Sequence, residues 1–112
     1  MAEVKLARRR IEPGKEARLR SWFDELADRQ SAVVETLEHE GVYTETAFVG
    51  AVDGATYLYL YMEAERLDTA EAAGEEERYE IDEEHHAVLQ ETLAGEWEVL
   101  DTIGHFVNPS LR

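Results

Sequence analysis

The sequence of 112 residues contains no cysteine, which excludes disulfides, thiol catalysis and cysteine-ligated zinc or iron–sulfur sites. It also lacks any apolar run near the roughly 18–20 residues that span a bilayer. Residues 1–14 show no apolar signal-peptide segment. We therefore expect a cytoplasmic protein that does not enter membranes. The length suits one compact core, so a single domain over residues 1–112 is expected.

Positive charge is scarce: 11 basic residues face 26 acidic ones, the formal net charge is -15, and lysine occurs only at Lys5 and Lys15. Such a surface repels itself in ordinary salt, whereas about 1 M salt screens charges within about 3 Å. The acidic residues are spread through periodic segments, which argues against a disordered acidic tail. The composition therefore suggests a halophilic host. It also argues against nucleic-acid binding, since no basic face exists to contact phosphates.

Apolar spacing predicts six main elements in the order β-α-β-β-α-β, with an extra short helix before the second long one. The first helix should begin near Pro13, end at Gly41 and break near Ser31, whereas Asp82 should cap the last helix and Gly95 should end it. The expected strands cover residues 3–11, 42–52, 55–63 and 96–107, and the expected long helices cover residues 13–40 and 83–94.

Asp53-Gly54 is the strongest local signal, because this dipeptide favours a two-residue hairpin turn between residues 42–52 and 55–63. A type I′ turn would pair Val52 with Ala55. One side of the hairpin would then hold the pairs Phe48–Tyr59, Thr46–Tyr61 and Gly50–Tyr57. The other side would hold Val49–Leu58, Ala47–Leu60 and Glu45–Met62. Both sides are largely apolar or aromatic, so both need a cover.

This element order is that of a ferredoxin-like α+β fold, a four-stranded antiparallel sheet with both long helices on one face. The face opposite the helices would expose a large apolar area, for which a second copy of the same sheet is the simplest cover. We therefore expect a homodimer, with the chain as its own partner. The expected interface residues are Phe48, Tyr57, Tyr59 and Tyr61.

The element order resembles the dimeric α/β-barrel superfamily, and the segments "ETAFVGAVDGATYLYLYMEAE" and "IDEEHHAVLQETL" resemble a family of unknown function common in halophilic archaea. The superfamily resemblance implies two sheets closed into a barrel, with a cavity between sheet and helices in each protomer. Haem-degrading and cofactor-independent monooxygenase members combine asparagine, histidine and aromatic groups. Here Asn108 is the only asparagine and follows the last expected strand, which weakens that assignment. The sugar-mutarotase branch offers only a loose analogy.

His85 falls inside the apolar stripe formed by Val88, Leu89 and Leu93 on the last helix. The register places Glu45 on the side of the sheet assigned to the helices, where an ionised carboxylate needs a donor. We therefore expect His85 and Glu45 to share a cavity as a candidate catalytic pair. Tyr43 and Met62 are the candidate ligand-binding residues. The expected activity is binding of, or acid–base chemistry on, a small organic molecule without a cofactor.

Other interpretations stay open. His85 and Glu45 could be a satisfied polar pair in the core of a non-catalytic dimerisation or sensing module, or a register slip could keep them apart. A cavity of about 300 Å³ or more reaching His85 would favour the pocket, and close packing would favour the core. No metal is expected, since His85 and His86 diverge by about 100° on a helix. His105 is expected to be a strand histidine near the dimer seam.

Overall fold

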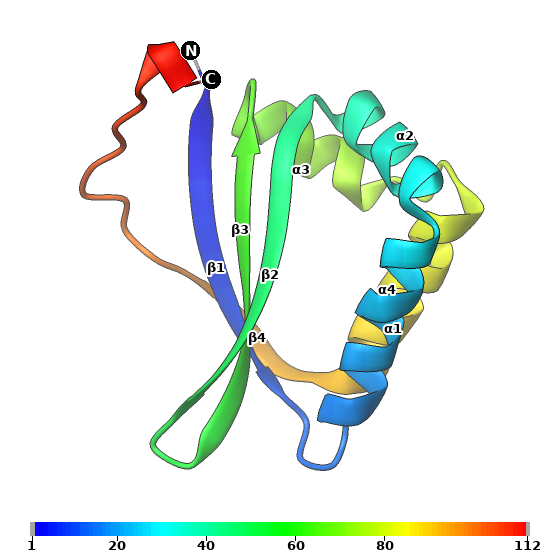
Figure 1. The fold of residues 1–112 in the computed structure, drawn as a ribbon. Coiled ribbons are helices and arrows are strands. Elements are labelled where there is room, and N and C mark those ends of the chain that lie inside the picture. The colour runs from blue at the N-terminus through cyan, green and yellow to red at the C-terminus, as the bar shows by residue number, and fades with distance from the viewer. Residues whose placement is uncertain (1, 112) are drawn as a thin grey trace.

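The computed structural model describes residues 2–111, whose four strands form one antiparallel sheet in the order β2-β3-β1-β4. The strands are β1 (Glu3–Ile11), β2 (Val42–Val52), β3 (Ala55–Ala64) and β4 (Leu93–Val99). The helices α1 (Glu16–Asp28), α2 (Gln30–Glu40), α3 (Leu67–Glu75) and α4 (Glu80–Thr92) lie on one side of the sheet, and a short 3-10 helix spans Pro109–Leu111 (Figure 1). The predicted ferredoxin-like α+β fold is confirmed.

The β2–β3 hairpin has the predicted register. Asp53 and Gly54 adopt φ of 50° and 80°, the left-handed pair that a type I′ turn requires, and Val52 pairs with Ala55. All six further predicted pairs are present, from Gly50–Tyr57 to Glu45–Met62. The register shifts between Val42 and Thr44, so Val42 pairs with Ala64 and is buried. Tyr43 lies in this bulge and is 56% exposed.

The expected long first helix is two helices, because the backbone breaks at Arg29 with φ -112° and ψ 38°. The break lies two residues before the predicted position at Ser31. Arg29 is held there by the carboxylates of Glu25, at 3.0 Å, and of Glu84 on α4, at 2.8 Å. Gly41 ends α2 with φ 70°, as predicted.

Helix α4 begins and ends earlier than predicted. Tyr79, not Asp82, precedes its first residue, and the Asp82 carboxylate accepts a hydrogen bond from the Tyr79 backbone N–H at 3.0 Å. An acid at the third helical position satisfies the N-terminus in this way without being the cap residue. The helix ends at Thr92, and Gly95, at φ 70°, lies within β4, where the β1–β4 register shifts.

The core lies between the sheet and the helices. One cluster of buried residues joins strands β1, β3 and β4 to helices α1 and α4, and a smaller cluster lies beneath α3. The larger cluster consists of Ile11, Leu19, Trp22, Leu58, Ile81, Val88 and Leu93, and the smaller of Val42, Ala64 and Ala70. The alternation along β3 thus sends Leu58 toward the helices, and Tyr57 and Tyr59 to the other face, the open face of the sheet.

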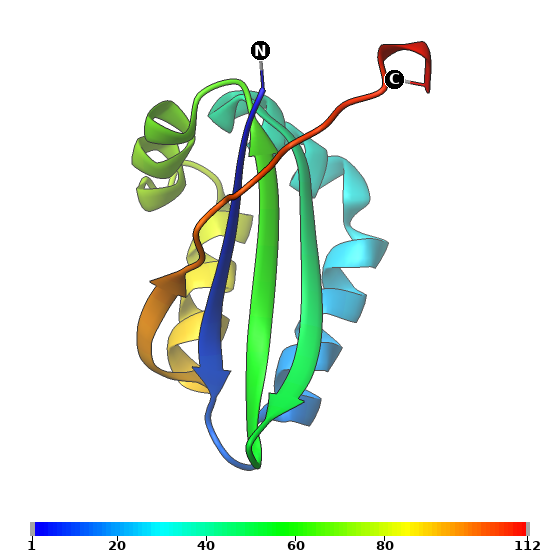
Figure 2. The same cartoon turned by 90° about the vertical axis from the view of Figure 1, so that its left-hand side faces the viewer.

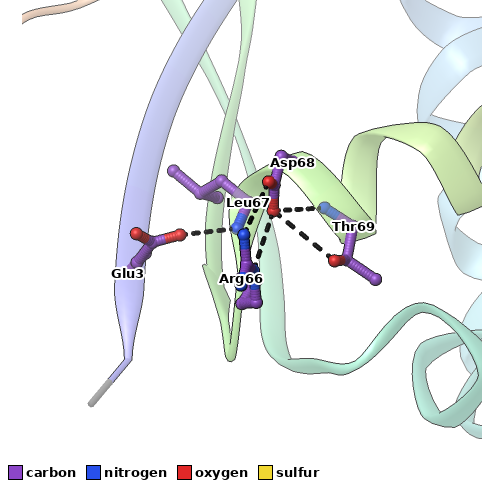
Figure 3. A network of polar contacts seen from close by, with 5 residues as sticks. All are labelled: Glu3, Arg66, Leu67, Asp68 and Thr69. Carbon is purple, nitrogen blue, oxygen red and sulfur yellow. Dashed lines mark hydrogen bonds and ion pairs between the residues drawn. The ribbon is translucent and has the colours of Figure 1, made fainter.

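The start of α3 is fixed by a polar network that reaches strand β1 (Figure 3). The Glu3 carboxylate accepts a hydrogen bond from the Leu67 backbone N–H at 2.7 Å. Asp68 accepts bonds from the Arg66 guanidinium, at 2.9 Å, and from the Thr69 backbone N–H, at 2.8 Å. The Arg66 bond, followed by the Thr69 bond, lowers the pKa of Asp68 to about 2. A carboxylate from a distant strand therefore replaces a local helix cap.

Substituting Glu3→Ala should lower the free energy of unfolding by about 0.5–1 kcal/mol, the usual value of a helix-capping acceptor. Urea denaturation measures the loss. The control is Glu12→Ala, which removes an equal charge from an exposed position whose side chain makes no hydrogen bond in the described chain. Equal effects of the two substitutions would show that only charge repulsion, not the cap, is involved.

The last strand ends at Val99, so the prediction of a strand through residue 107 is wrong. The Leu100 backbone N–H still donates to Leu6 O at 2.8 Å, after which the chain leaves the edge of β1. Residues 100–108, the tail, then cross the open face of the sheet in front of β1 and β3 (Figure 2). His105 therefore lies in this tail rather than in a strand.

Candidate functional site

His85 lies between α1 and α4, where its Nδ1 accepts a hydrogen bond of 2.8 Å from Trp22 Nε1. The two rings stack with centroids 6.1 Å apart, and Phe23 meets the imidazole edge-on at 6.1 Å. An Nδ1 that accepts a hydrogen bond cannot carry a proton, so the neutral ring is protonated at Nε2. The sequence predicted the inward position of His85, whereas its bond to Trp22 was not foreseen.

The environment of His85 favours the neutral imidazole. Desolvation by burial and the neighbouring His86 lower the pKa of His85 to about 4, against a weaker opposing effect of Asp82. At neutral pH the ring is therefore uncharged and does not take up a proton readily. It can still donate a hydrogen bond through Nε2–H.

Glu45 lies on the helix side of the sheet, in one row with Met62 and Lys5. Burial raises the pKa of Glu45, and the charge of Lys5 opposes the shift. The accessible area, however, places Glu45 among the exposed residues. Both observations fit a carboxyl that water reaches from one direction while protein atoms surround it on the others.

Glu40, the last residue of α2, is a further candidate that the sequence reasoning missed. Burial, the charge of Glu45 and then that of Asp82 raise the pKa of Glu40 to about 7. Its Oε2 lies 3.8 Å from the position that a Cβ on Gly74 would occupy, which places the carboxyl near α3. The one sequence signal was an acid at a helix C-terminus, where the helix dipole disfavours negative charge.

The charge of Glu45 acts on Glu40, and the charge of Lys5 acts on Glu45, so these side chains influence one another electrostatically. Glu45 and Met62 are cross-strand neighbours, as predicted. Within residues 2–111 no hydrogen bond joins Glu45 to His85, whose partner is Trp22. We call Glu40 and Glu45 the carboxyl pair.

Two cavities in the described part of the chain do not reach Tyr43, Glu45, Met62 or His85, the residues of the predicted pocket. One, of about 330 Å³, lies between the open face and the tail. The other, of about 450 Å³, lies between α2 and α3 and is lined by His39, Asp68, Thr69, Ala72, Ala73 and Glu76. Among residues 2–111, no group of three or more His, Cys, Asp or Glu side chains could hold a metal ion.

The fold and these sites define a class of small ferredoxin-like α+β proteins. Among solved structures, similar chains include a protein from Fusobacterium nucleatum provisionally assigned as a monooxygenase (13% identity, 88% of this chain, TM-score 0.62) and L-rhamnose mutarotase from Formosa agariphila (12% identity, 94% of this chain and 99% of the other, TM-score 0.61). A third is a mutant form of SnoaB, a cofactor-independent oxygenase from Streptomyces nogalater (11% identity, 96% and 98%, TM-score 0.56). This chain spans 41% of the Fusobacterium chain. At these identities the likeness shows the fold alone.

Residues 2–110 match the model of a family of unknown function, DUF6176, and the chain belongs to that family. No curated protein matches the sequence. None of the helices within residues 2–111 is long and apolar enough to cross a bilayer.

Proposed function

We propose that residues 1–112 form a single homodimeric domain that binds, or performs acid–base chemistry on, a small organic molecule beside the carboxyl pair. The observation that carries this proposal is the placement of two carboxyls, Glu40 from α2 and Glu45 from β2, in one charge-coupled group between helices and sheet. Both pKa values are raised, and that of Glu40 is near neutrality. Groups poised in this range suit proton transfer.

The residues around the pair suit a polar, uncharged ligand. Burial and the charge of Glu45 raise the pKa of Glu40 to about 7, so near neutral pH Glu40 can donate or accept a proton. Lys5 lies in the same row as Glu45, although it already pairs with Glu71 at 2.8 Å. Met62 would supply apolar contact. His85, with a pKa of about 4, would act in such a site through its Nε2–H as a hydrogen-bond donor rather than as a base.

Substituting Glu45→Gln should lower the pKa of Glu40 below 7, because a nearby negative charge is removed, yet leave it above the ordinary 4.5, because burial remains. A carboxyl-carbon NMR titration of Glu40 measures this. Glu35→Gln on the same helix is the matched control, since Glu35 is exposed, and it should leave the Glu40 titration unchanged. A wild-type Glu40 that titrates near 4.5 would contradict the proposed coupling.

The binding part of the proposal is tested with the same variant. Monosaccharides, phenols and small carboxylic acids are titrated into the wild-type protein and followed by amide chemical shifts. A true ligand should shift the amides of Lys5, Glu45 and Met62 in a saturable way and should bind Glu45→Gln more weakly. A panel that leaves these three amides unmoved would argue against this site.

The second candidate function is a non-catalytic dimerisation or sensing module, and the closed Trp22–His85 contact favours it. Trp22 is only 3% exposed, and its N–H is satisfied by the imidazole. This is the geometry of a satisfied core histidine. Under this alternative, substituting Glu40 or Glu45 would change the free energy of unfolding. The same substitutions would not weaken the binding of any small molecule.

Support for the homodimer comes from apolar side chains left exposed on the open face and the tail. Phe48 is 55% exposed, and Ile103 and Phe106 are 100% and 95% exposed. The tyrosines are better covered than the sequence predicted, because the Arg8 guanidinium lies 4.4 Å from the Tyr57 ring centroid and approaches the Tyr59 hydroxyl at 3.5 Å. A second copy would cover the residues that remain exposed.

A further inference from the structure

Arg9 is an arginine of β1 that has no carboxylate partner within residues 2–111. Carboxylates are not scarce, since acidic residues outnumber basic ones by 26 to 11 and the adjacent Arg8 donates to Glu98 at 2.7 Å. The Nε of Arg9 is also the one buried side-chain nitrogen or oxygen in the described chain without a hydrogen-bond partner. We propose that Arg9, together with Trp97 beside it, binds a small organic carboxylate at the edge of the sheet.

The side chain of Arg9 is closed to solvent at Nε and open at its tip. The residue as a whole is half-buried, and its two terminal nitrogens are neither hydrogen-bonded within residues 2–111 nor buried, so solvent reaches them. These two nitrogens can hold a carboxylate through two parallel hydrogen bonds. An unsatisfied buried donor costs free energy, so stability alone does not explain an arginine at this position.

A bulge between β1 and β4 brings Trp97 beside Arg9. The β1–β4 register shifts at Arg9, and residues 95–97 of β4 all lie opposite this one residue. Gly95 permits the bulge, because its φ of 70° lies in the left-handed region that favours glycine. The Arg9 guanidinium carbon lies 5.8 Å from the centroid of the Trp97 ring. The bulge therefore places an aromatic surface next to an unpaired cation.

The two side chains select a monoanion with an apolar body. One guanidinium balances one negative charge, whereas a dianion such as a phosphate ester would keep a charge that the net charge of -15 repels. Trp97 is 37% exposed on β4, whose outer edge pairs with no strand of the described chain (Figure 2), so an apolar body can lie on the indole from the solvent side. Glu96, the acid of the bulge, is exposed and forms no ion pair with Arg9 within residues 2–111.

This site is separate from the carboxyl pair. Arg9 lies four residues beyond Lys5 in β1, which is about 13 Å along a strand. Carboxylate binding at Arg9 therefore does not depend on the proposed acid–base function. Shifted NMR signals of Arg9 and Trp97 report this site, and those of Lys5, Glu45 and Met62 report the carboxyl pair.

The test is an NMR titration of the wild-type protein with 3-phenylpropanoate in about 1 M NaCl, where repulsion by the surface charge is screened. The neutral 3-phenyl-1-propanol and the cationic 3-phenylpropylamine serve as comparison ligands. The carboxylate should bind saturably and shift the Arg9 amide and the Trp97 indole N–H, while the indole N–H of Trp22 stays unmoved. The alcohol should bind at least about tenfold more weakly, since hydrogen bonds between charged groups are lost. The amine should not shift these signals.

Two variants test the roles of the two side chains. Arg9→Met removes the cation and the unsatisfied Nε, so it should weaken 3-phenylpropanoate binding at least about tenfold and unfold at no lower urea concentration than the wild type. Trp97→Leu should weaken binding about threefold, because the aromatic surface is lost, and it tests the proposal even if Arg9→Met unfolds. Arg10→Met is the matched control, since it removes an equal charge from the exposed neighbouring position, and it should bind like the wild type. Equal affinity for carboxylate and alcohol, wild-type affinity in either variant, or no saturable carboxylate binding would overturn the proposal.

Discussion

Replacing His85 by leucine is expected to lower the free energy of unfolding by about 2 kcal/mol, although leucine is the more apolar side chain. Trp22 is 3% exposed and donates its Nε1–H to His85 Nδ1 at 2.8 Å, so the substitution leaves a buried donor unsatisfied. His85→Asn keeps an acceptor near the Nδ1 position and should lose less than half as much. Urea denaturation at pH 7.5 in about 1 M NaCl measures both, with surface repulsion screened.

The Trp22–His85 bond is isolated by a double-mutant cycle with Trp22→Phe and His85→Leu. Removing both partners at once avoids the unsatisfied donor, so the coupling energy should be about 1–2 kcal/mol. A His85→Leu protein more stable than the wild type would show that the bond contributes nothing. In that case a functional role, and not stability, would explain why a histidine occupies position 85.

The same variants carry a pH signature with a defined sign. The pKa of His85 is lowered from 6.5 to about 4, so the unfolded chain binds more protons in this interval and stability falls as the pH drops from 6.5 to 4. A shift of this size corresponds to about 3 kcal/mol. Glu40 opposes it, since a pKa raised from 4.5 to about 7 makes stability rise as the pH falls through that interval. The wild type should therefore show a shallow profile, and His85→Asn should gain stability on acidification from pH 7 to 4.5.

Elements that depend on local chemistry could be predicted from the sequence. A type I′ turn requires left-handed backbone at both central residues, and Asp53 and Gly54 adopt it. This turn sets the hairpin register and thereby places Glu45 beside Met62. The bulge at Tyr43 could not be foreseen, because it depends on Val42 packing against Ala64 beneath α3. Alternation alone therefore placed Tyr43 on the helix side.

Features that depend on how elements meet were missed. A helical wheel turned His85 inward, but its bond to Trp22 depends on how α1 and α4 lie against each other, which no local pattern encodes. The raised pKa of Glu40 depends on its burial and on the charges of Glu45 and Asp82, which come from other elements of the fold. The alternation of Ile103, His105 and Val107 resembled a strand, yet pairing ends where Leu100 bonds to Leu6.

Substituting Phe48→Glu is expected to convert the proposed homodimer into a monomer, with a dissociation constant at least about a hundredfold higher. Phe48 is 55% exposed on the open face opposite Tyr59, so a second sheet packed there would bury it. A glutamate in its place would have to lose its hydration without a partner, at a cost of several kcal/mol. Sedimentation equilibrium in about 1 M NaCl measures the change, and the wild type should sediment at twice the 12.8 kDa of one chain.

Val34→Glu is the matched control, because Val34 is 41% exposed on α2, on the helix side of the sheet, and this variant should remain a dimer. Lower salt should weaken association of the wild type, since each chain carries a net charge of -15. A wild-type mass of 12.8 kDa in high salt would show that the protein is a monomer. Arg8 and the tail would then cover the open face without a second copy. The full exposure of Ile103 and Phe106 would then need a partner other than a second copy.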